Sequence, residues 1–299
     1  MKVTITGGTG FVGGRLVAQL LAEGHEVRIL GRSAKTGIAP KAEFYLWDAA
    51  QGEPPLESLA DCDVVVHLAG EPVAQRWSPE IRRRIRSSRV EGTRLLVDAL
   101  GRMERPSAVL VTASATGFYG DRGDDELTEE SQPGGGFLAE VCQAWEAEAE
   151  RAQKLGIRVV RLRTGVVLGV GGGALRQMLP PFKMFIGGQL GSGRQWMPWI
   201  HIDDLTGLIR LAIETPGLKG AVNGTAPNPA RNTEFTRVLA RTLHRPALFT
   251  VPEAALKLLF GDMAEILLGS QRVLPEAARR ARYRFQFPDL GPALKNLLG

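Results

Sequence analysis

The segment Lys2-Val-Thr-Ile-Thr-Gly7-Gly8-Thr-Gly10-Phe-Val-Gly13 constrains this chain more than any other. A β-rich run leads directly into glycines at fixed offsets and then into an amphipathic helical pattern. Glycine is needed where a strand turns tightly into a helix, where backbone touches a pyrophosphate, and where the helix packs closely on the sheet. The phosphates then lie at the helix N-terminus, where free N–H groups and the dipole favour negative charge. The spacing Gly8-x-Gly10-x-x-Gly13 therefore predicts a dinucleotide site, and the alternative is a tight turn with no ligand.

The end of the next predicted strand indicates which dinucleotide is bound. Residues 26–30 run into Gly31-Arg32-Ser33, at about the 20-residue distance where an NAD binder carries Asp or Glu for the ribose 2′-hydroxyl. No acid is there, and an arginine fork with a serine hydroxyl suits a 2′-phosphate. We therefore predict NADP(H) rather than NAD, with Lys35 as a further candidate. The alternative is that Arg32 is a solvated loop charge.

Length and composition limit the class of protein. The chain has 299 residues, enough for one large domain or a core with an appended lobe. No apolar run reaches the roughly 18 residues of a membrane span, and the N-terminus begins a strand instead of a signal peptide. A cytoplasmic location without a membrane partner is expected. Cys62 and Cys142 lie far apart, so neither a disulfide framework nor a metal site is expected.

The net charge of +5 and the arginine-rich stretch 82–94 raise the question of nucleic acid. Ser78-Pro79-Glu80 is typical of a helix start, with a capping hydroxyl, an early proline and an early acid. The helix that follows has a partial apolar face, so most of its arginines are expected in solvent. Without a recognised binding motif or aromatic residues interleaved for base stacking, no nucleic-acid partner is expected.

Alternating strand-like and helix-like segments predict an α/β fold, a Rossmann-type doubly wound parallel sheet with a small, mainly helical C-terminal lobe. Short apolar runs fit strands buried on both faces. Residues 1–168 are expected to form the NADP-binding domain, with 199–226 returning to it, and 169–198 and 227–299 to form the substrate lobe and C-terminal domain. The expected strands lie near 2–6, 26–30, 43–47, 63–68, 108–113 and 157–163.

Motifs spread along the whole chain together carry a family resemblance. After the glycine motif they are His67-Leu-Ala-Gly70, Ser114-Ala-Thr-Gly-Phe-Tyr-Gly120, Arg161-Leu-Arg-Thr-Gly-Val-Val-Leu-Gly169, Trp199-Ile-His-Ile-Asp-Asp204, Ala226-Pro-Asn-Pro229, Gln271-Arg-Val-Leu-Pro275 and Phe285-Gln-Phe-Pro288. The chain resembles an atypical extended short-chain dehydrogenase/reductase of the NAD(P)-dependent epimerase/dehydratase branch. Within that branch it resembles the "epimerase family protein" group, which has a small C-terminal domain of its own.

The resemblance implies a set of cofactor contacts. Asp48 would approach the adenine edge, and residues 68–70 would line the path between adenosine and nicotinamide. It also implies a homodimer through the helices that hold 80–100 and 137–154. The expected cofactor-binding residues are Gly7, Gly10, Phe11, Val12, Gly13, Arg32, Ser33, Asp48, Leu68, Ala69, Gly70 and Glu71.

The expected catalytic residues depart from the usual pattern of the family. Ser114 matches the family's active-site hydroxyl, and Thr112 lies on the same strand face. Typical members then carry Tyr-x-x-x-Lys, but alignment of the helix from Phe137 puts Leu138 and Cys142 at those positions, and neither can exchange the proton or supply the charge. The expected catalytic residues are therefore Ser114, Thr112 and Tyr119. The alternatives are a satisfied buried hydroxyl at 112 or 114 and a packed loop aromatic at 119.

The expected substrate-binding residues are Trp77, Arg194, Trp196, Trp199 and His201. The tryptophans suggest an apolar or planar ligand, with Arg194 or Arg89 for a carboxylate or phosphate. Packing of the lobe on the core is the alternative for the aromatic residues. For His201 the alternative is a structural hydrogen bond. The sequence thus predicts an NADP(H)-binding oxidoreductase or epimerase acting on an unknown small molecule. The competing hypothesis is a non-catalytic protein that senses NADP(H).

Overall fold

A central parallel sheet organises the protein. The computed structural model describes residues 1–33 and 41–299. Seven strands pair in the order β12-β7-β5-β4-β1-β2-β3, and every pairing is parallel. Their bounds are β1 Lys2–Thr6, β2 Glu26–Gly31, β3 Glu43–Leu46, β4 Val64–His67, β5 Val109–Ala115, β7 Arg158–Thr164 and β12 Gly220–Gly224. The order reverses between β1 and β4, as in a doubly wound Rossmann-type sheet.

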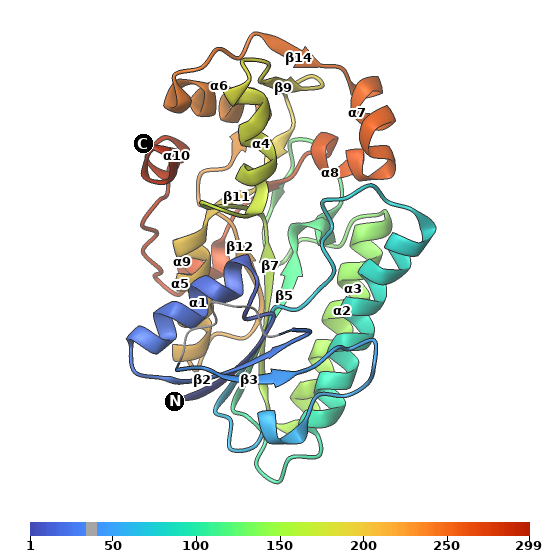
Figure 1. The fold of residues 1–299 in the computed structure, drawn as a ribbon, viewed down its shortest axis with the longest axis vertical. Coiled ribbons are helices and arrows are strands. Elements are labelled where there is room, and N and C mark those ends of the chain that lie inside the picture. Colours follow the sequence, from blue (N-terminus) through green and yellow to red (C-terminus); the bar gives the residue numbers. More distant parts are fainter. Residues whose placement is uncertain (34–40) are drawn as a thin grey trace.

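Helices cover both faces of the sheet (Figure 1). On one face α1 (Phe11–Ala22) packs with α5 (Ile202–Glu214), and on the other α2 (Pro79–Leu100) packs with α3 (Phe137–Glu150). Apolar side chains of the central strands are buried toward both layers, for example Val64 and Val66 on one side and Val65 on the other. This double burial explains the short continuous apolar runs in the sequence.

The predicted start of the arginine-rich helix is confirmed. The Ser78 hydroxyl accepts a hydrogen bond from the Ile81 N–H (3.2 Å), and Pro79 occupies the first turn of α2. Ile85, Leu96 and Leu100 turn to the core, so the arginines are displaced to the remaining faces.

A second, mainly helical lobe lies above the carboxyl ends of the strands (Figure 1). Its core contains Trp199, Phe235 and Leu294. Pairs of short strands join its parts: β8 with β11, β9 with β14, β10 with β13, and β15 with β6. The elements of these regions are β6 Glu126–Leu127, β8 Val166–Leu168, α4 Gly173–Lys183, β9 Gly188–Leu190, β10 Trp196–Met197, β11 Trp199–His201, β13 Ala230–Arg231, α6 Asn232–Leu243, β14 Phe249–Val251, α7 Glu253–Phe260, α8 Ala264–Leu268, β15 Arg272–Val273, α9 Glu276–Arg280 and α10 Leu290–Leu298. Single 3₁₀ turns lie at Leu56–Ser58, Thr116–Tyr119, Arg151–Leu155 and Gly261–Met263.

Within residues 1–33 and 41–299, no helix combines the length and the apolarity needed to cross a membrane.

Candidate functional site

The glycine loop between β1 and α1 is held by close backbone contacts. Gly7 has φ +71°, and a Cβ there would lie 2.9 Å from the Ala69 nitrogen. A Cβ on Gly13 would lie 2.3 Å from the Gly7 carbonyl oxygen. Gly10, exposed at the N-cap of α1, has no side chain to cap the helix, and the first turn contains no acid. The positive end of α1 is therefore open to an anion from outside.

A buried hydrogen-bond chain that the sequence reasoning missed supports the neighbouring loop at 68–70. The Thr6 hydroxyl accepts from the N–H groups of Leu68 (3.2 Å) and Ala69 (3.1 Å) and donates to Nδ1 of His67 (2.7 Å). Nε2 of His67 then donates to the Thr93 hydroxyl (3.0 Å). Burial lowers the pKa of His67 to about 4, so the ring is neutral. The available signal was the position of Thr6 and His67 at the ends of predicted strands, which pair in register.

Arg32 lies at the end of β2 with 66% of its side chain exposed. Its Nη1 is 3.9 Å from Oε2 of Glu71, whereas Oε1 of Glu71 accepts from Arg84 (2.8 Å) and Gln75 (3.3 Å). Glu71 is buried, so its carboxylate is a fixed partner at the edge of the site. Ser33 is exposed beside Arg32, and Lys35 lies outside the described residues.

Two other predicted cofactor residues make contacts of their own. Asp48 is half-buried and accepts from the Ala50 N–H (3.0 Å), which shapes the turn after β3. Phe11 and Val12 begin α1, and the Phe11 ring packs on the loop at 169–173. A Cβ on Gly172 would lie 2.3 Å from that ring, and one on Gly169 would lie 2.5 Å from it.

Ser114 near the end of β5 belongs to a buried charged network. Its hydroxyl donates to Oε1 of Glu146 (2.6 Å), which is itself 3% exposed. Arg163 forks onto the same carboxylate through Nε (2.8 Å) and Nη2 (2.9 Å), and Arg161 adds a third donor (3.0 Å). The carboxylate is thus satisfied inside the protein.

The other two predicted catalytic hydroxyls are fully buried. The Tyr119 hydroxyl donates to Asn223 (2.7 Å) and accepts from Arg163 (3.0 Å). Burial raises the pKa of Tyr119, so the phenol is neutral near pH 7. Thr112 donates to the Ala113 carbonyl at 3.3 Å. These contacts correspond to the structural alternatives considered for both residues.

The predicted substrate residues do not converge on one point. Trp77 and Trp199 are buried, and their indole N–H groups donate to the carbonyls of Val73 and Asn228. His201 is also buried, and its Nδ1 accepts from the Asp203 N–H (3.1 Å) as the N-cap of α5. These three side chains therefore have structural contacts.

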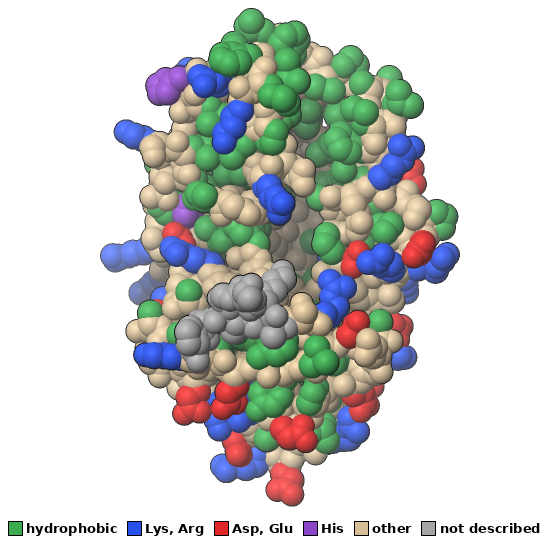
Figure 2. Space-filling view, viewed as in Figure 1, with side chains coloured by type: hydrophobic (Ala, Val, Ile, Leu, Met, Phe, Trp, Pro, Cys, Tyr) green, Lys and Arg blue, Asp and Glu red, His purple; other side chains and the backbone are tan. Residues whose placement is uncertain are grey.

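Trp196 and Arg194 lie nearer to the surface. The Trp196 indole donates to Asp124 (2.7 Å), with the guanidinium groups of Arg231 and Arg272 over its ring. Arg194 is exposed. The face of the molecule drawn in Figure 2 is hollowed between the α4 side and the side of α2 and α3. The hollow lies above the carboxyl ends of the strands, where doubly wound sheets bind ligands.

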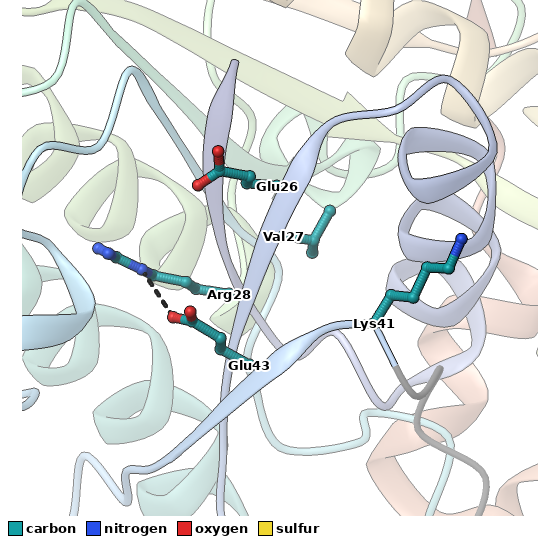
Figure 3. A pocket seen from close by; sticks show the side chains of 5 residues that line it. All are labelled: Glu26, Val27, Arg28, Lys41 and Glu43. Carbon is teal, nitrogen blue, oxygen red and sulfur yellow. Dashed lines mark hydrogen bonds and ion pairs between the residues drawn. The ribbon is translucent and has the colours of Figure 1, made fainter.

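A pocket at the opposite end of the sheet is small and polar (Figure 3). Glu26, Val27 and Arg28 at the start of β2 line it together with Lys41 and Glu43. Among these residues, Arg28 pairs with Glu43 at 3.2 Å. Its place at the amino ends of the strands separates it from the glycine loop.

Comparison with known proteins decides the family. A profile described as "NAD dependent epimerase/dehydratase family" matches residues 3–223, and a domain of unknown function, DUF1731, matches 251–297. The chain belongs to the NAD dependent epimerase/dehydratase family. It is 43% identical over 302 residues to the chloroplastic epimerase family protein SDR39U1 homolog of Arabidopsis thaliana, covering 100% of this chain and 87% of that one. It is 37% identical over 299 residues to the epimerase family protein YfhF of Bacillus subtilis (100% and 98% covered).

A solved relative in this family contains a cofactor. The structure of human epimerase family protein SDR39U1 (isoform 2) with NADPH superposes with a TM-score of 0.88 at 36% identity, covering 100% of this chain and 99% of that one. The predicted epimerase-family resemblance is therefore confirmed.

In this epimerase-family chain, helix α3 presents Leu138, Cys142 and Glu146 one turn apart. Leu138 packs against Gly117, and the Cys142 thiol lies 3.8 Å from the Ala115 carbonyl. Burial raises the pKa of Cys142 to about 11, so the thiol is neutral. The charged group of this row is Glu146, one turn beyond Cys142.

Proposed function

We propose that this protein binds NADP(H), with the adenosine 2′-phosphate at Arg32 and the diphosphate at the N-terminus of α1. The observation that carries the proposal is the exposed Arg32 guanidinium at the end of β2, next to a glycine loop that leaves the positive end of α1 uncapped. A planar guanidinium forms forked, charge-assisted hydrogen bonds to phosphate. The NADPH in the human relative supports the same assignment.

Under this proposal the glycine loop, Phe11, Val12, Arg32, Ser33, Asp48 and the segment 68–71 form the cofactor site of a Rossmann unit made of residues 1–168 and 199–226. Residues 169–198 and 227–299 form the lobe over the carboxyl ends of the strands. The glycine contacts and the open end of α1 support the cofactor side. The hollow under α4 supports a small-molecule site between cofactor and lobe.

Calorimetric titration with NADPH, NADP, NADH and NAD tests the cofactor assignment. We expect the phosphorylated forms to bind at least about tenfold more tightly, and Arg32→Ala to abolish that preference. Arg102→Ala is the matched control, because Arg102 is paired with Glu53 and lies at the far end of α2. Absence of binding by folded protein free of carried-over cofactor would remove the proposal.

We further propose oxidoreductase or epimerase chemistry on a small molecule with Ser114 as the hydroxyl that contacts substrate. Bound cofactor would supply or accept the hydride. Ser114 would take the proton of a substrate hydroxyl as its own proton passes to Glu146, a carboxylate already 2.6 Å away. A substrate screen that follows nicotinamide absorbance tests this, with Ser114→Ala as the variant. Unchanged turnover in that variant excludes the role.

A specific observation favours the alternative of an NADP(H)-sensing protein without turnover. Tyr119 is turned inward to Asn223 and Arg163, and the helix positions at 138 and 142 hold no acid or base that is charged at pH 7. Hydrogen exchange of the loop at 169–173 with oxidised and reduced cofactor distinguishes the two functions. A sensor shows different protection in the two states while every screened substrate leaves the cofactor unchanged.

The homodimer implied by the resemblance would use the outer faces of α2 and α3. These helices pack on each other and lie at one side of the molecule (Figure 1). Light scattering after size exclusion measures the mass directly, and a monomer at all concentrations tested would exclude the dimer.

A further inference from the structure

Arg89 of α2 reaches beneath the loop that follows β4. A Cβ built on Gly70 would lie 3.3 Å from the Arg89 guanidinium carbon. Its Nη1 donates to the carbonyls of Glu71 (3.0 Å) and Ile85 (3.1 Å), and the guanidinium lies 5.2 Å from the ring centre of Trp145. The Arg89 guanidinium is thereby held by contacts with α2, with α3 and with the loop that follows β4.

This fixed cation forms no ion pair within 4 Å among the described residues, and the Glu71 carboxylate acts on it from a greater distance. The carboxylate of Glu71 pairs with Arg32 and Arg84, whereas Arg89 hydrogen-bonds to the Glu71 carbonyl. Nε and Nη2 of Arg89 have no hydrogen-bond acceptor in the described part of the chain, whereas Nη1 has two. Burial lowers the pKa of Arg89, which records the cost of desolvating the charge. A half-buried guanidinium with two free donor nitrogens is suited to a polar ligand.

The position of Arg89 in the fold identifies which half of a bound dinucleotide lies next to it. In a doubly wound sheet a dinucleotide lies across the point where the strand order reverses. Here β1, β2 and β3 lie on one side of that point, with Arg32 at the end of β2, and β4, β5 and β7 lie on the other. Gly70 follows β4, so Arg89 lies in the half opposite to the 2′-phosphate. That half receives the nicotinamide ribose.

The Cys142 side chain of α3 lies near Arg89. Cys142 is buried and neutral, and the positive charge of Arg89 is close enough to oppose the rise of its pKa. Since α3 contains no lysine or arginine, the positive charge beside Cys142 comes from Arg89 of α2.

We propose that Arg89 is a cofactor-binding residue that donates from Nε and Nη2 to the hydroxyls of the nicotinamide ribose, supplying from α2 the positive charge that α3 lacks at Cys142. This inference rests on the proposed binding of NADP(H). It assigns a second arginine to the same ligand, at the opposite end from Arg32.

Two probes separate the ends of the ligand in a calorimetric experiment on the full chain. NADPH spans both halves, whereas 2′,5′-ADP has the phosphorylated adenosine and no nicotinamide ribose. We expect Arg89→Met to weaken NADPH binding about tenfold and to leave 2′,5′-ADP binding within about twofold of wild type. Arg32→Ala is expected to weaken both probes. Arg86→Met is the matched control, because Arg86 is exposed on the same helix.

The outcomes distinguish this inference from the proposed function. If wild type binds neither probe, the NADP(H) site itself is wrong. If wild type binds both and Arg89→Met binds both as wild type does, or loses both equally, Arg89 is structural and the inference is overturned. Thermal unfolding checks that the variant is folded. Should Arg89→Met not fold, the same two titrations are made on Arg89→Lys, because lysine keeps the charge and loses the fork. A loss of affinity for NADPH alone supports the inference, and a ratio of the two affinities equal to that of wild type overturns it.

Discussion

The two halves of the sheet end in different ways. At the end of β1 and β2, polar groups are left open, namely the first-turn N–H groups of α1 and the exposed Arg32. At the ends of β5 and β7, Ser114 donates to Glu146, and Arg163 donates to both Glu146 and Tyr119 in the interior. The ends of β1 and β2 thus leave donors open, whereas the side chains at the ends of β5 and β7 are largely paired. Cofactor binding and chemistry are therefore separable properties in this fold.

The largest expected effect is in the half of the sheet that holds β5 and β7. Arg163→Met leaves the buried Glu146 carboxylate with a weaker set of donors and removes a donor from Tyr119. We expect a loss of about 3–5 kcal/mol in the free energy of unfolding, measured by urea denaturation. The control is Arg280→Met, whose pair with Glu130 is exposed, with an expected change below about 1 kcal/mol. Equal effects in both variants would show that the network does not hold this half together.

The next largest expected effect concerns His67, whose hydrogen-bond chain supports the loop at 68–70. His67 has a folded pKa of about 4 against an ordinary value of 6.5, so below about pH 6.5 the unfolded chain binds a proton that the native state does not. Stability contributed by the neutral ring is complete above pH 6.5 and falls as the pH is lowered toward 4. We expect about 2 kcal/mol less stability at pH 5 than at pH 8 from this residue. Urea titrations of His67→Gln should show a flatter dependence, and identical slopes would exclude His67 as the cause.

A pair of glycine variants directly tests the glycine loop in the half that holds β1 and β2. A Cβ on Gly13 meets the Gly7 carbonyl at 2.3 Å, whereas one on Gly14 meets the Gly8 carbonyl at 3.7 Å. Gly13→Ala should cost about 1–3 kcal/mol and weaken NADPH binding. Gly14→Ala should be neutral or stabilising by up to about 1 kcal/mol, because alanine favours the helix. Thermal unfolding with and without NADPH measures both, and the same cost in each would mean that the close contact does not matter.

The smallest effect concerns Cys142. Its buried thiol acts as a small apolar group, so Cys142→Ala should cost about 1 kcal/mol. NADPH affinity should stay within about twofold, since the neutral thiol is assigned no hydrogen bond to the cofactor. A loss of affinity above about tenfold in calorimetry would show that the thiol itself binds the cofactor.

The fold was predictable because its signals are local. The glycine spacing and the doubly buried strands reflect sterics and burial, and the six expected strands begin and end within two residues of the observed ones. The seventh sheet strand, β12, was harder to predict. Its sequence, Gly220-Ala-Val-Asn-Gly224, has few β-branched residues, and it depends on pairing with β7.

The candidate site was predictable only where one segment defines it. Arg32 follows from its place after a strand, but the partners of Tyr119 and Ser114 come from strands and helices over 30 residues away. No spacing in the sequence shows that Arg163 turns inward under Phe118, or that Arg89 is the arginine of its run that faces the loop at Gly70. Such contacts follow from tertiary packing, which periodicity does not report.

The Phe11 ring connects two parts of the molecule that are otherwise remote in sequence. It begins the helix whose first turn faces the proposed diphosphate, and it fills the space left by glycines at 169, 172 and 173 before α4. A ligand that shifts this ring must also shift the loop that enters the upper lobe. By thermodynamic reciprocity, whatever favours the loop position of the bound state then tightens diphosphate binding by the same factor. The three glycines therefore connect the lobe to the sheet through their contacts with the Phe11 ring. Gly172→Ala should change cofactor affinity although residue 172 lies outside the proposed cofactor site.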